Sequence, residues 1–399
     1  MKRSFVVIVL GAGAILGVAL GTRQSLGLFL PAMTSELGMG RQTFAFAMAI
    51  QNLLWGVFQP FLGMVADRFG AGRVVAVGGI VYAIGLVLMS NASGPLLLNV
   101  GGGILIGFGV AAGGFAVVLG AVGRLVAPER RGMALGIASA GGSVGQFAIA
   151  PFGQALIEAA GWRGALLQLA LISLLMAPLA VFVAGRPSSA NPGGAEAVSL
   201  KAALAEAAAN PSFRYLTLGF FVCGFQLVFV AVHFPAYLVD SGFPATLGAT
   251  SLALIGFFNI IGTWGAGALG DRYSRKYLLS AFYAARAVVI AIFLVAPKTP
   301  LTVMIFAASV GLLWLGTVPL TSGLVAHIFG VRYMGTLFGI VFLSHQLGSF
   351  VGVWLGGFAF DRTGSYDLVW WISIGLGLAA ALIHLPIVER PLRLAPRPA

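Results

Sequence analysis

Two arginines lie inside long apolar runs of the chain, where no acidic residue stands beside them. These residues are Arg23 and Arg286. A guanidinium does not readily lose its proton, and at bilayer depth it costs at least about 2.5 to 3.5 kcal/mol. Each must therefore find backbone carbonyls, water or an anionic substrate as its partner. Because the planar guanidinium suits a carboxylate bidentately, we infer a cavity that binds a small organic anion.

Two histidines could carry protons. His233 and His345 also lie inside apolar runs, whereas all 11 acidic residues fall at or beyond the ends of such runs. Proton coupling through a buried carboxylate is therefore not expected, and histidine would be the carrier if protons move. An anion exchanger needs neither histidine. A histidine that is hydrogen-bonded to a neighbouring helix is a common structural alternative.

The composition places these residues in a membrane. Of the 399 residues, 59% are hydrophobic and only 9% are charged, which argues against a soluble enzyme. The net charge of +12 does not predict a nucleic-acid partner, because the chain has hardly any solvated face to carry it. We expect no metal and no cofactor, since Cys223 is the single cysteine and no nucleotide-binding loop occurs. No nucleophile and base stand together at membrane depth, so an enzyme is not expected.

The apolar runs fit twelve membrane helices, each with about 20 or more residues. Charged or Gly/Pro-rich segments separate them. The predicted spans are 5–31, 43–66, 72–91, 95–124, 131–158, 163–185, 213–239, 246–270, 276–296, 300–328, 333–360 and 366–388. An even number of spans places both termini on one side of the membrane.

The positive charges predict which side that is. Most of the 23 Lys and Arg residues fall on the side of the N-terminus. The cations expected on the other side are Arg41, Arg163, Lys298 and Arg362. The positive-inside rule then places both termini in the cytoplasm, with the protein in the bacterial inner membrane. Lys2 and Arg3 imitate a secretory signal, but so many spans follow that we expect an uncleaved first helix.

The chain repeats itself about a polar linker. Gly63, Asp67 and Arg68 recur 204 residues later as Gly267, Asp271 and Arg272, and Gly132, Gly136, Gly145 and Gly161 recur 203 residues later as Gly335, Gly339, Gly348 and Gly364. This repeat predicts two six-helix halves, 1–185 and 212–399, joined by a cytoplasmic linker, 186–211, with a short surface helix. Such a duplication is typical of secondary transporters that bind substrate between their halves.

One loop motif has a recognisable pattern. Gly63-Met-Val-Ala-Asp67-Arg68-Phe-Gly70-Ala-Gly-Arg73 resembles the loop motif of the major facilitator superfamily, and Gly267-Ala-Leu-Gly-Asp271-Arg272-Tyr-Ser-Arg275-Lys276 is a degenerate second copy. The resemblance implies an all-α membrane protein with twelve transmembrane helices. The expected gating residues, which pair between helices at the cytoplasmic end without touching substrate, are Asp67, Arg68, Arg73, Asp271 and Arg272.

A second motif resembles one branch of that superfamily. Pro128-Glu129-Arg130-Arg131-Gly132-Met-Ala-Leu-Gly136, followed by Ser139-Ala-Gly-Gly-Ser143-Val-Gly145, is similar to the monocarboxylate porters and oxalate/formate antiporters. The branch implies carboxylate substrates, a cation in helix 1, which fits Arg23, and a cation in helix 11, where His345 stands. It commonly has an arginine in helix 8, where this chain has Asn259 and Thr263. Arg286 lies one helix later, on a helix that is usually peripheral in this fold, and would contribute only if that helix turns inward.

Amide side chains and one tryptophan complete the predicted site. They lie on helices that line the cavity in this fold, where they could orient a carboxylate, although each is more often a tie between helices. The predicted substrate-binding residues are Arg23, Gln146, Gln226, His233, Asn259, Arg286, Trp314, His345 and Gln346.

The sequence thus predicts a secondary active transporter that moves a mono- or dicarboxylate by alternating access, as anion exchange or proton symport. Its partners would be the anion, membrane lipid and, for symport, protons; we expect a monomer. One alternative is an efflux pump of the same fold for amphipathic drugs. Another is a non-transporting membrane protein that senses a ligand, which counterflow in proteoliposomes would distinguish.

Overall fold

The computed structural model describes residues 4–127, 130–185, 200–330 and 334–391. These residues form helices and turns, without a strand. The part before the linker comprises α1 (Phe5–Ser25), η1 (Leu26–Phe29), α2 (Leu30–Leu37), α3 (Arg41–Phe69), α4 (Ala71–Ser90), α5 (Pro95–Leu98), η2 (Asn99–Leu105), α6 (Ile106–Ala112), α7 (Phe115–Leu125), α8 (Arg131–Leu174) and α9 (Met176–Val183).

The part from residue 200 onward begins with a short helix at the position predicted for the surface helix. Residues 186–199 of the predicted linker lie outside the described residues, as do Pro128, Glu129 and Arg332. The helices are α10 (Leu200–Ala209), α11 (Pro211–Asp240), α12 (Ala245–Gly270), α13 (Arg275–Val295), α14 (Pro300–Leu312), α15 (Thr317–Phe329), α16 (Met334–Thr363) and α17 (Asp367–His384).

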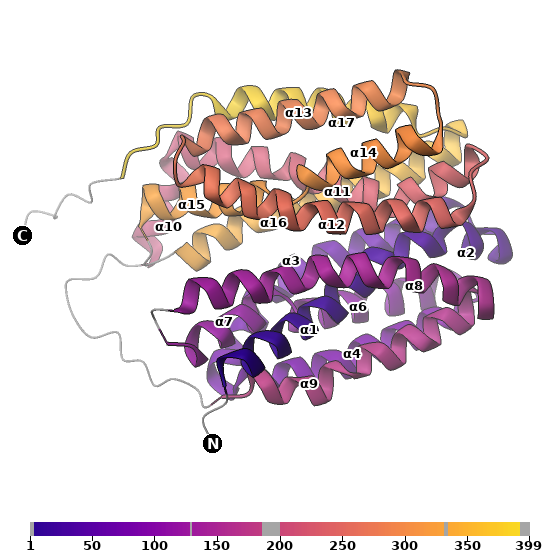
Figure 1. Cartoon of the computed structure of the whole chain (residues 1–399), viewed down its shortest axis with the longest axis horizontal. Coiled ribbons are helices and arrows are strands. Elements are labelled where there is room, and N and C mark those ends of the chain that lie inside the picture. The colour runs from indigo at the N-terminus through magenta and orange to yellow at the C-terminus, as the bar shows by residue number, and fades with distance from the viewer. Residues whose placement is uncertain (1–3, 128–129, 186–199, 331–333, 392–399) are drawn as a thin grey trace, which may run out of the picture.

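The prediction of twelve membrane helices is confirmed once one long element is divided. The described chain holds 11 continuous apolar segments long enough to cross a membrane, and one of them, Met133–Val183, has 51 residues. Within it, Gly161 adopts φ 67° and ψ 170°, which are not helical values. A positive φ favours glycine because it has no Cβ. Figure 1 shows the ribbon turning back within α8, the element that contains this glycine. The segment therefore supplies both the fifth and the sixth span.

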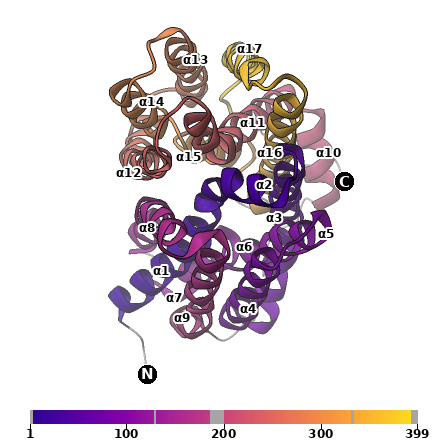
Figure 2. The ribbon, with the colours of Figure 1, turned by 90° about the vertical axis from the view of Figure 1, so that its right-hand side faces the viewer.

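The spans form two bundles, one from α1 to α9 and the other from α11 to α17. Figure 2 shows the bundles one above the other, with α3 beside α16 and α8 beside α12 at their boundary. We call the end of the molecule where α3 begins the Arg41 end, and the end where α3 meets α4 the linker end. α1 begins and α17 ends at the linker end (Figure 1).

Glycines allow α1 and α8 to pack with their backbones in contact. A Cβ on Gly145 would lie 2.0 Å from the carbonyl oxygen of Gly17, and a Cβ on Gly21 would lie 2.5 Å from the carbonyl carbon of Gly145. Small residues at such positions let membrane helices approach closely. The repeated glycines of the sequence therefore act in part as helix-packing residues.

We expect Gly145→Ala to destabilise the folded protein by about 1–3 kcal/mol, because the added methyl group cannot fit without moving a helix. A thermal unfolding curve of the purified protein in detergent measures the loss. Gly136→Ala is the matched control on the same helix, since a Cβ on Gly136 would meet no atom within 4 Å. Equal melting temperatures for the two variants would contradict this assignment.

The two bundles touch along only part of their boundary. On α3 and α16, a Cβ on Gly357 would lie 2.7 Å from the Cβ of Ala45, close to the Arg41 end. Gly63 and Gly339, on the same two helices near the linker end, have open space around the corresponding position. These helices therefore separate toward the linker end.

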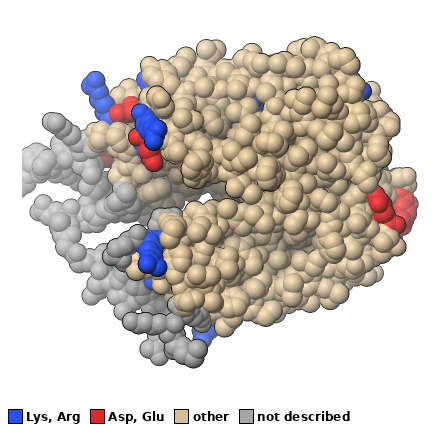
Figure 3. Space-filling model, viewed as in Figure 1, with Lys and Arg blue, Asp and Glu red and all other residues tan. Residues whose placement is uncertain are grey.

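The pair α8 and α12 behaves in the same way. A Cβ on Gly256 would lie 2.9 Å from the backbone nitrogen of Phe147, whereas Gly136 and Gly267, nearer the linker end, have open space. The space-filling view in Figure 3 shows the corresponding hollow between the bundles, which opens at the linker end and narrows toward the middle. The structure is thus closed at the Arg41 end and open at the linker end.

Candidate functional site

Arg23 lies on α1 near the boundary between the bundles. It is buried, with 8% of its surface exposed. One guanidinium nitrogen, Nη2, donates a hydrogen bond to Oδ1 of Asn52 on α3. The guanidinium carbon also lies 4.8 Å from the centre of the Trp55 ring, in a cation–π arrangement. Two residues one turn apart on α3 therefore hold the arginine in place.

Aromatic rings connect Arg23 to the second bundle. The Trp55 ring packs edge-on against Phe342 of α16, with centroids 5.5 Å apart, and Phe342 stacks on His345 at 5.6 Å. The neighbouring Gln346 packs against α3, since a Cβ on Gly56 would lie 2.7 Å from its Cγ. The structure thus brings three predicted ligands, Arg23, His345 and Gln346, to the same part of the boundary.

These side chains retain hydrogen-bonding capacity. Nδ1 of His345 lies 3.1 Å from Oε1 of Gln346, so a histidine N–H can donate to the amide oxygen. In the part of the chain that the structure describes, Nε of Arg23 and Nε2 of Gln346 are buried donors without a hydrogen-bond partner. We call Arg23, Asn52, Trp55, His345 and Gln346 the Arg23 site. Its unpaired donors suit a buried anionic acceptor.

No carboxylate among the described residues neutralises Arg23. The ion pairs that the described residues form are Arg41–Asp240, Arg124–Asp67, Arg163–Glu36 and Arg275–Asp271. All of them lie at the two ends of the molecule, as expected from the positions of the acidic residues in the sequence. The charge of Arg23 is therefore available to a ligand.

Arg286 has a different environment, inside the second bundle. It is 1% exposed, and its guanidinium donates to Oε1 of Gln226 at 3.1 Å and to the carbonyl oxygens of Leu313 and Trp314. Those carbonyls lie where helix 10 is interrupted between α14 and α15, so the arginine ties together α11, α13 and this break. Gln226 in turn donates to the carbonyl oxygen of Ser373 at 2.7 Å. Arg286, Gln226 and Trp314 form a structural cluster in this conformation.

Gln146 and Asn259 connect the bundles on the other flank of the boundary. Nε2 of Gln146 donates to the carbonyl oxygen of Leu252 at 3.2 Å, from α8 to α12. Asn259 donates to the hydroxyl of Ser143 at 2.8 Å and accepts from the backbone N–H of Leu315 at 3.0 Å. Both amides act as ties between helices here.

His233 lies apart from the Arg23 site, toward the Arg41 end. Its ring nitrogens contact the hydroxyl of Tyr366 at 3.2 Å and the carbonyl oxygen of Val353 at 2.8 Å. Tyr366 also accepts a hydrogen bond from Arg41. His233 is therefore associated with the closed end of the boundary.

The predicted gating residues lie at the open, linker end. Asp67 pairs with Arg124, and Asp271 lies 3.6 Å from Arg275, so each ion pair stays within one bundle. The other three predicted gating residues have exposed side chains and are Arg68, Arg73 and Arg272. Asp67 therefore pairs between two helices, α3 and α7, of one bundle. Among the described residues no ion pair joins the two bundles at this end, where they are separated.

The sequence analysis did not identify Trp55, and it did not predict that the charged residues at the Arg41 end form a cluster. Asn52 is one of the amides on helices expected to line the cavity, but it is not among the predicted substrate-binding residues. The internal repeat could have identified Trp55. It is 204 residues before the predicted site residue Asn259, the same offset that separates Gly63 and Gly267, so the two occupy equivalent positions in the two halves. Each residue contacts the break in the fourth span of its own half. Trp55 lies at the break between α6 and α7, since a Cβ on Gly114 would be 3.3 Å from its indole nitrogen, and Asn259 accepts a hydrogen bond from Leu315 at the break between α14 and α15.

Known proteins share this sequence and architecture. The family model described as "Major Facilitator Superfamily" matches residues 12–352 and 260–399. Monocarboxylate transporter 11 of Homo sapiens is 29% identical over 393 residues, which cover 95% of this chain and 82% of that protein. The uncharacterized MFS-type transporter YcxA of Bacillus subtilis (strain 168) is 24% identical, over 92% of this chain and 91% of that protein.

Solved structures show the same fold. A bacterial homolog of the human lysosomal transporter Spinster, in an inward-facing and occupied conformation, superimposes with a TM-score of 0.74. The match covers 96% of each chain at 15% sequence identity. The two bundles, the duplicated loop motif and the match of the family model along the chain agree, and the protein is a member of the major facilitator superfamily of membrane transporters.

Proposed function

We propose that the protein is a secondary active transporter for a small organic anion, a mono- or dicarboxylate, and that it works by alternating access. The observation that carries the proposal is Arg23, a buried cation at the boundary of the two bundles without a carboxylate partner among the described residues. An ionised guanidinium at membrane depth is stabilised by an anion that binds there. Relatives named monocarboxylate transporters support this substrate class.

The Arg23 site would hold the carboxylate from both halves. The guanidinium supplies paired donors from the first half, and Gln346 supplies an amide N–H from the second. Because the site joins α1 and α3 to α16, binding can favour an arrangement in which the halves approach each other. We propose 1–185 and 212–399 as the units that move, with 186–211 connecting them.

We propose that the linker end faces the cytoplasm of a bacterial cell and that the Arg41 end faces outward. On the face shown in Figure 3, most Lys and Arg side chains gather at the linker end. Positive charge of this kind marks the cytoplasmic side of inner-membrane proteins. The conformation described here would then be open to the inside.

Counterflow in proteoliposomes tests the proposal. Vesicles loaded with an unlabelled carboxylate are expected to accumulate the same labelled carboxylate from outside, because a carrier exchanges its substrate across the membrane. Vesicles loaded with a cationic drug serve as the comparison. Accumulation of the drug alone would favour drug efflux, and specific carboxylate binding without any exchange would favour a ligand sensor.

A carboxylate that occupies the site is also expected to stabilise the purified protein against heat. Stabilisation by mass action amounts to about 2.7 kcal/mol at a ligand concentration of 100 times Kd. A thermal-shift series with carboxylates, phosphate, sulfate and cationic drugs measures it, and the rise should be specific to carboxylates. A rise with cationic drugs only would contradict an anion site.

A further inference from the structure

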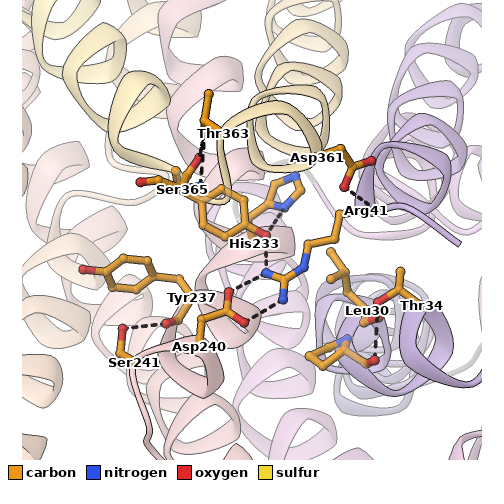
Figure 4. A network of polar contacts seen from close by, with 12 residues as sticks. Leu30, Thr34, Arg41, His233, Tyr237, Asp240, Ser241, Asp361, Thr363 and Ser365 are labelled. Carbon is orange, nitrogen blue, oxygen red and sulfur yellow. Dashed lines mark hydrogen bonds and ion pairs between the residues drawn. The ribbon is translucent and has the colours of Figure 1, made fainter. Parts of the chain in front are cut away.

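At the closed end, one arginine of the first half is held by side chains of the second half. Nη1 and Nη2 of Arg41 donate to the two carboxylate oxygens of Asp240 at 2.5 and 2.6 Å, as Figure 4 shows. Nη1 also donates to the hydroxyl of Tyr366 at 2.8 Å, and the guanidinium carbon lies 3.7 Å from the centre of the Phe360 ring. A bidentate arginine–carboxylate pair of this kind is among the stronger polar contacts in proteins.

A second carboxylate closes the same end. Asp361 of α16 accepts hydrogen bonds from the backbone N–H groups of Arg41 and Gln42, both at 2.8 Å. It therefore caps the N-terminus of α3 from the other half of the molecule. We call Arg41, Asp240, Asp361 and Tyr366 the Arg41 cluster. Its contacts must break whenever the halves separate at this end.

His233 connects to the Arg41 cluster in a way that specifies its protonation state. Its side chain is 1% exposed, and its Nε2 lies 2.8 Å from the carbonyl oxygen of Val353. A carbonyl only accepts, so Nε2 carries a hydrogen. The other nitrogen, Nδ1, lies 3.2 Å from the hydroxyl of Tyr366. That hydroxyl accepts from Arg41 and can donate its own hydrogen to Nδ1, provided that Nδ1 carries none.

The tyrosine remains a donor in these surroundings. Burial raises the pKa of Tyr366 well above its usual value, against the lowering effect of the nearby Arg41 guanidinium. The hydrogen bonds then run in one direction, from Arg41 to Tyr366, from Tyr366 to His233, and from His233 to Val353. This sequence of donors requires a neutral imidazole.

We propose that His233 is a proton-binding site and that a proton on its Nδ1 releases the Arg41 cluster, so that the Arg41 end opens. The proton would remove the acceptor of the Tyr366 hydroxyl and would place a positive charge beside Arg41. Asp240 and Asp361 could neutralise that charge, but in the closed state the first is paired with Arg41 and the second caps α3.

The sign of the pH effect follows from the two states. The closed state holds neutral His233. We expect opening of the Arg41 end to admit water to the imidazole, where histidine takes up a proton near its ordinary pKa of about 6.5. Acid therefore favours the open state, and the closed state predominates as the pH rises above that range. The other titratable groups near the imidazole are Arg41 of α3, Tyr237 and Asp240 of α11, Asp361 of α16, and Tyr366 just before α17. Asp367, the first residue of α17, follows Tyr366 in the chain.

This inference rests on the proposed alternating-access function and assigns protons a place in it. If the Arg41 end faces outward, protons from outside would promote opening to the outside. The proposal concerns a conformational equilibrium, so it can be tested without any transported substrate.

The test measures the distance between the two halves at the Arg41 end as the pH changes. Spin labels are placed on cysteines introduced at the exposed Ser93, between α4 and α5, and at the exposed Ala245, which begins α12. The native Cys223 is replaced by serine. Between pH 8 and pH 5, the population with the longer distance is expected to rise at least about fivefold in the full-length protein in nanodiscs.

Two substitutions identify the histidine. His233→Gln keeps a donor for Val353 and an acceptor for Tyr366 but does not titrate, so its distances should stay short at every pH. His327→Gln, which removes an exposed histidine at the linker end, should respond to pH as the unsubstituted protein does. Arg41→Gln should show the longer distance at every pH, because it removes the ion pair with Asp240.

The results distinguish failure of the proposed proton site from failure of the proposed transport function. A pH response that persists in His233→Gln, or distances that do not change with pH in the unsubstituted protein, would overturn the proton site. Because no substrate is present, a protein that fails to transport carboxylates can still show this response. A protein that transports carboxylates with pH-independent distances would refute the proton site and leave the proposed function standing.

Discussion

Arg23→Gln is expected to raise the KM for a transported carboxylate at least about tenfold, because a hydrogen bond to a charged group contributes about 1.5–3 kcal/mol and 1.4 kcal/mol corresponds to tenfold. The variant keeps a polar side chain that can still bond to Asn52 but removes the guanidinium charge. Initial rates of exchange in proteoliposomes, measured against substrate concentration at equal protein content, give the KM.

Two further variants show whether the effect belongs to the site. Arg163→Gln removes an exposed guanidinium that contacts Glu36 and Ser90 of its own bundle at the Arg41 end and has no contact with the Arg23 site, so it should leave the KM unchanged. Arg23→Lys keeps the charge but loses the planar pair of donors, so an intermediate KM is expected. Transport by Arg23→Gln with the KM of the unsubstituted protein would remove the main support for the anion site.

Arg286→Gln is expected to cause a large loss of stability with little change in KM. The substitution leaves the carbonyl oxygens of Leu313 and Trp314 and the amide oxygen of Gln226 without their donor. A buried acceptor without a partner costs about 1–3 kcal/mol, and these three lie around the interruption of helix 10. Thermal unfolding in detergent measures the loss, and exchange kinetics at a permissive temperature measure the KM.

The matched control for Arg286 is Arg214→Gln in the same half. Arg214 is exposed, and among the described residues its guanidinium donates to a single carbonyl oxygen, that of Ala208, so loss of the guanidinium should change the melting temperature little. If Arg286→Gln unfolds at the temperature of the unsubstituted protein but has a raised KM, Arg286 is a substrate ligand and the structural assignment fails.

The fold was predictable because its signals are local. Apolar runs, glycines, prolines and charge asymmetry are read from neighbouring residues, and together they gave the twelve spans. The turn between the fifth and sixth spans was visible as Gly161, whose counterpart Gly364 also has a positive φ of 70°. The two halves were predictable from the internal sequence repeat, because equivalent helices of the two halves need similar residues at the positions where they pack.

The structure brings some of the residues named from the sequence together in the candidate site and places others elsewhere. Arg23, His345 and Gln346 were named from their chemistry, and they meet at the boundary. Arg286 has the same chemistry but faces the inside of its own bundle, because the carbonyls between α14 and α15 and Gln226 accept its hydrogen bonds. The rotation of a helix about its axis depends on its neighbours, and an apolar run on all faces does not reveal it.

For the Arg41 cluster, too, the sequence predicted where the charged residues lie along the spans but not which of them make contact. The predicted spans 43–66, 213–239 and 333–360 leave Arg41, Asp240 and Asp361 just beyond their ends on the same side of the membrane. The sequence did not predict that these residues pair. Partners that are 199 and 320 residues apart meet only after both bundles have folded and closed at that end.

The amino-acid sequence alone predicts that this chain has a duplicated membrane-transporter fold and that two arginines must be buried away from acidic residues. Both conclusions follow from the cost of transferring polar and charged groups into hydrocarbon, which acts on each segment separately. The folded structure was needed to show which arginine faces the boundary, which amides tie helices together and which end is closed. These depend on contacts between α3 and α16, α8 and α12, and α13 and α15, because packing between distant segments selects one helix rotation and one arrangement of the halves.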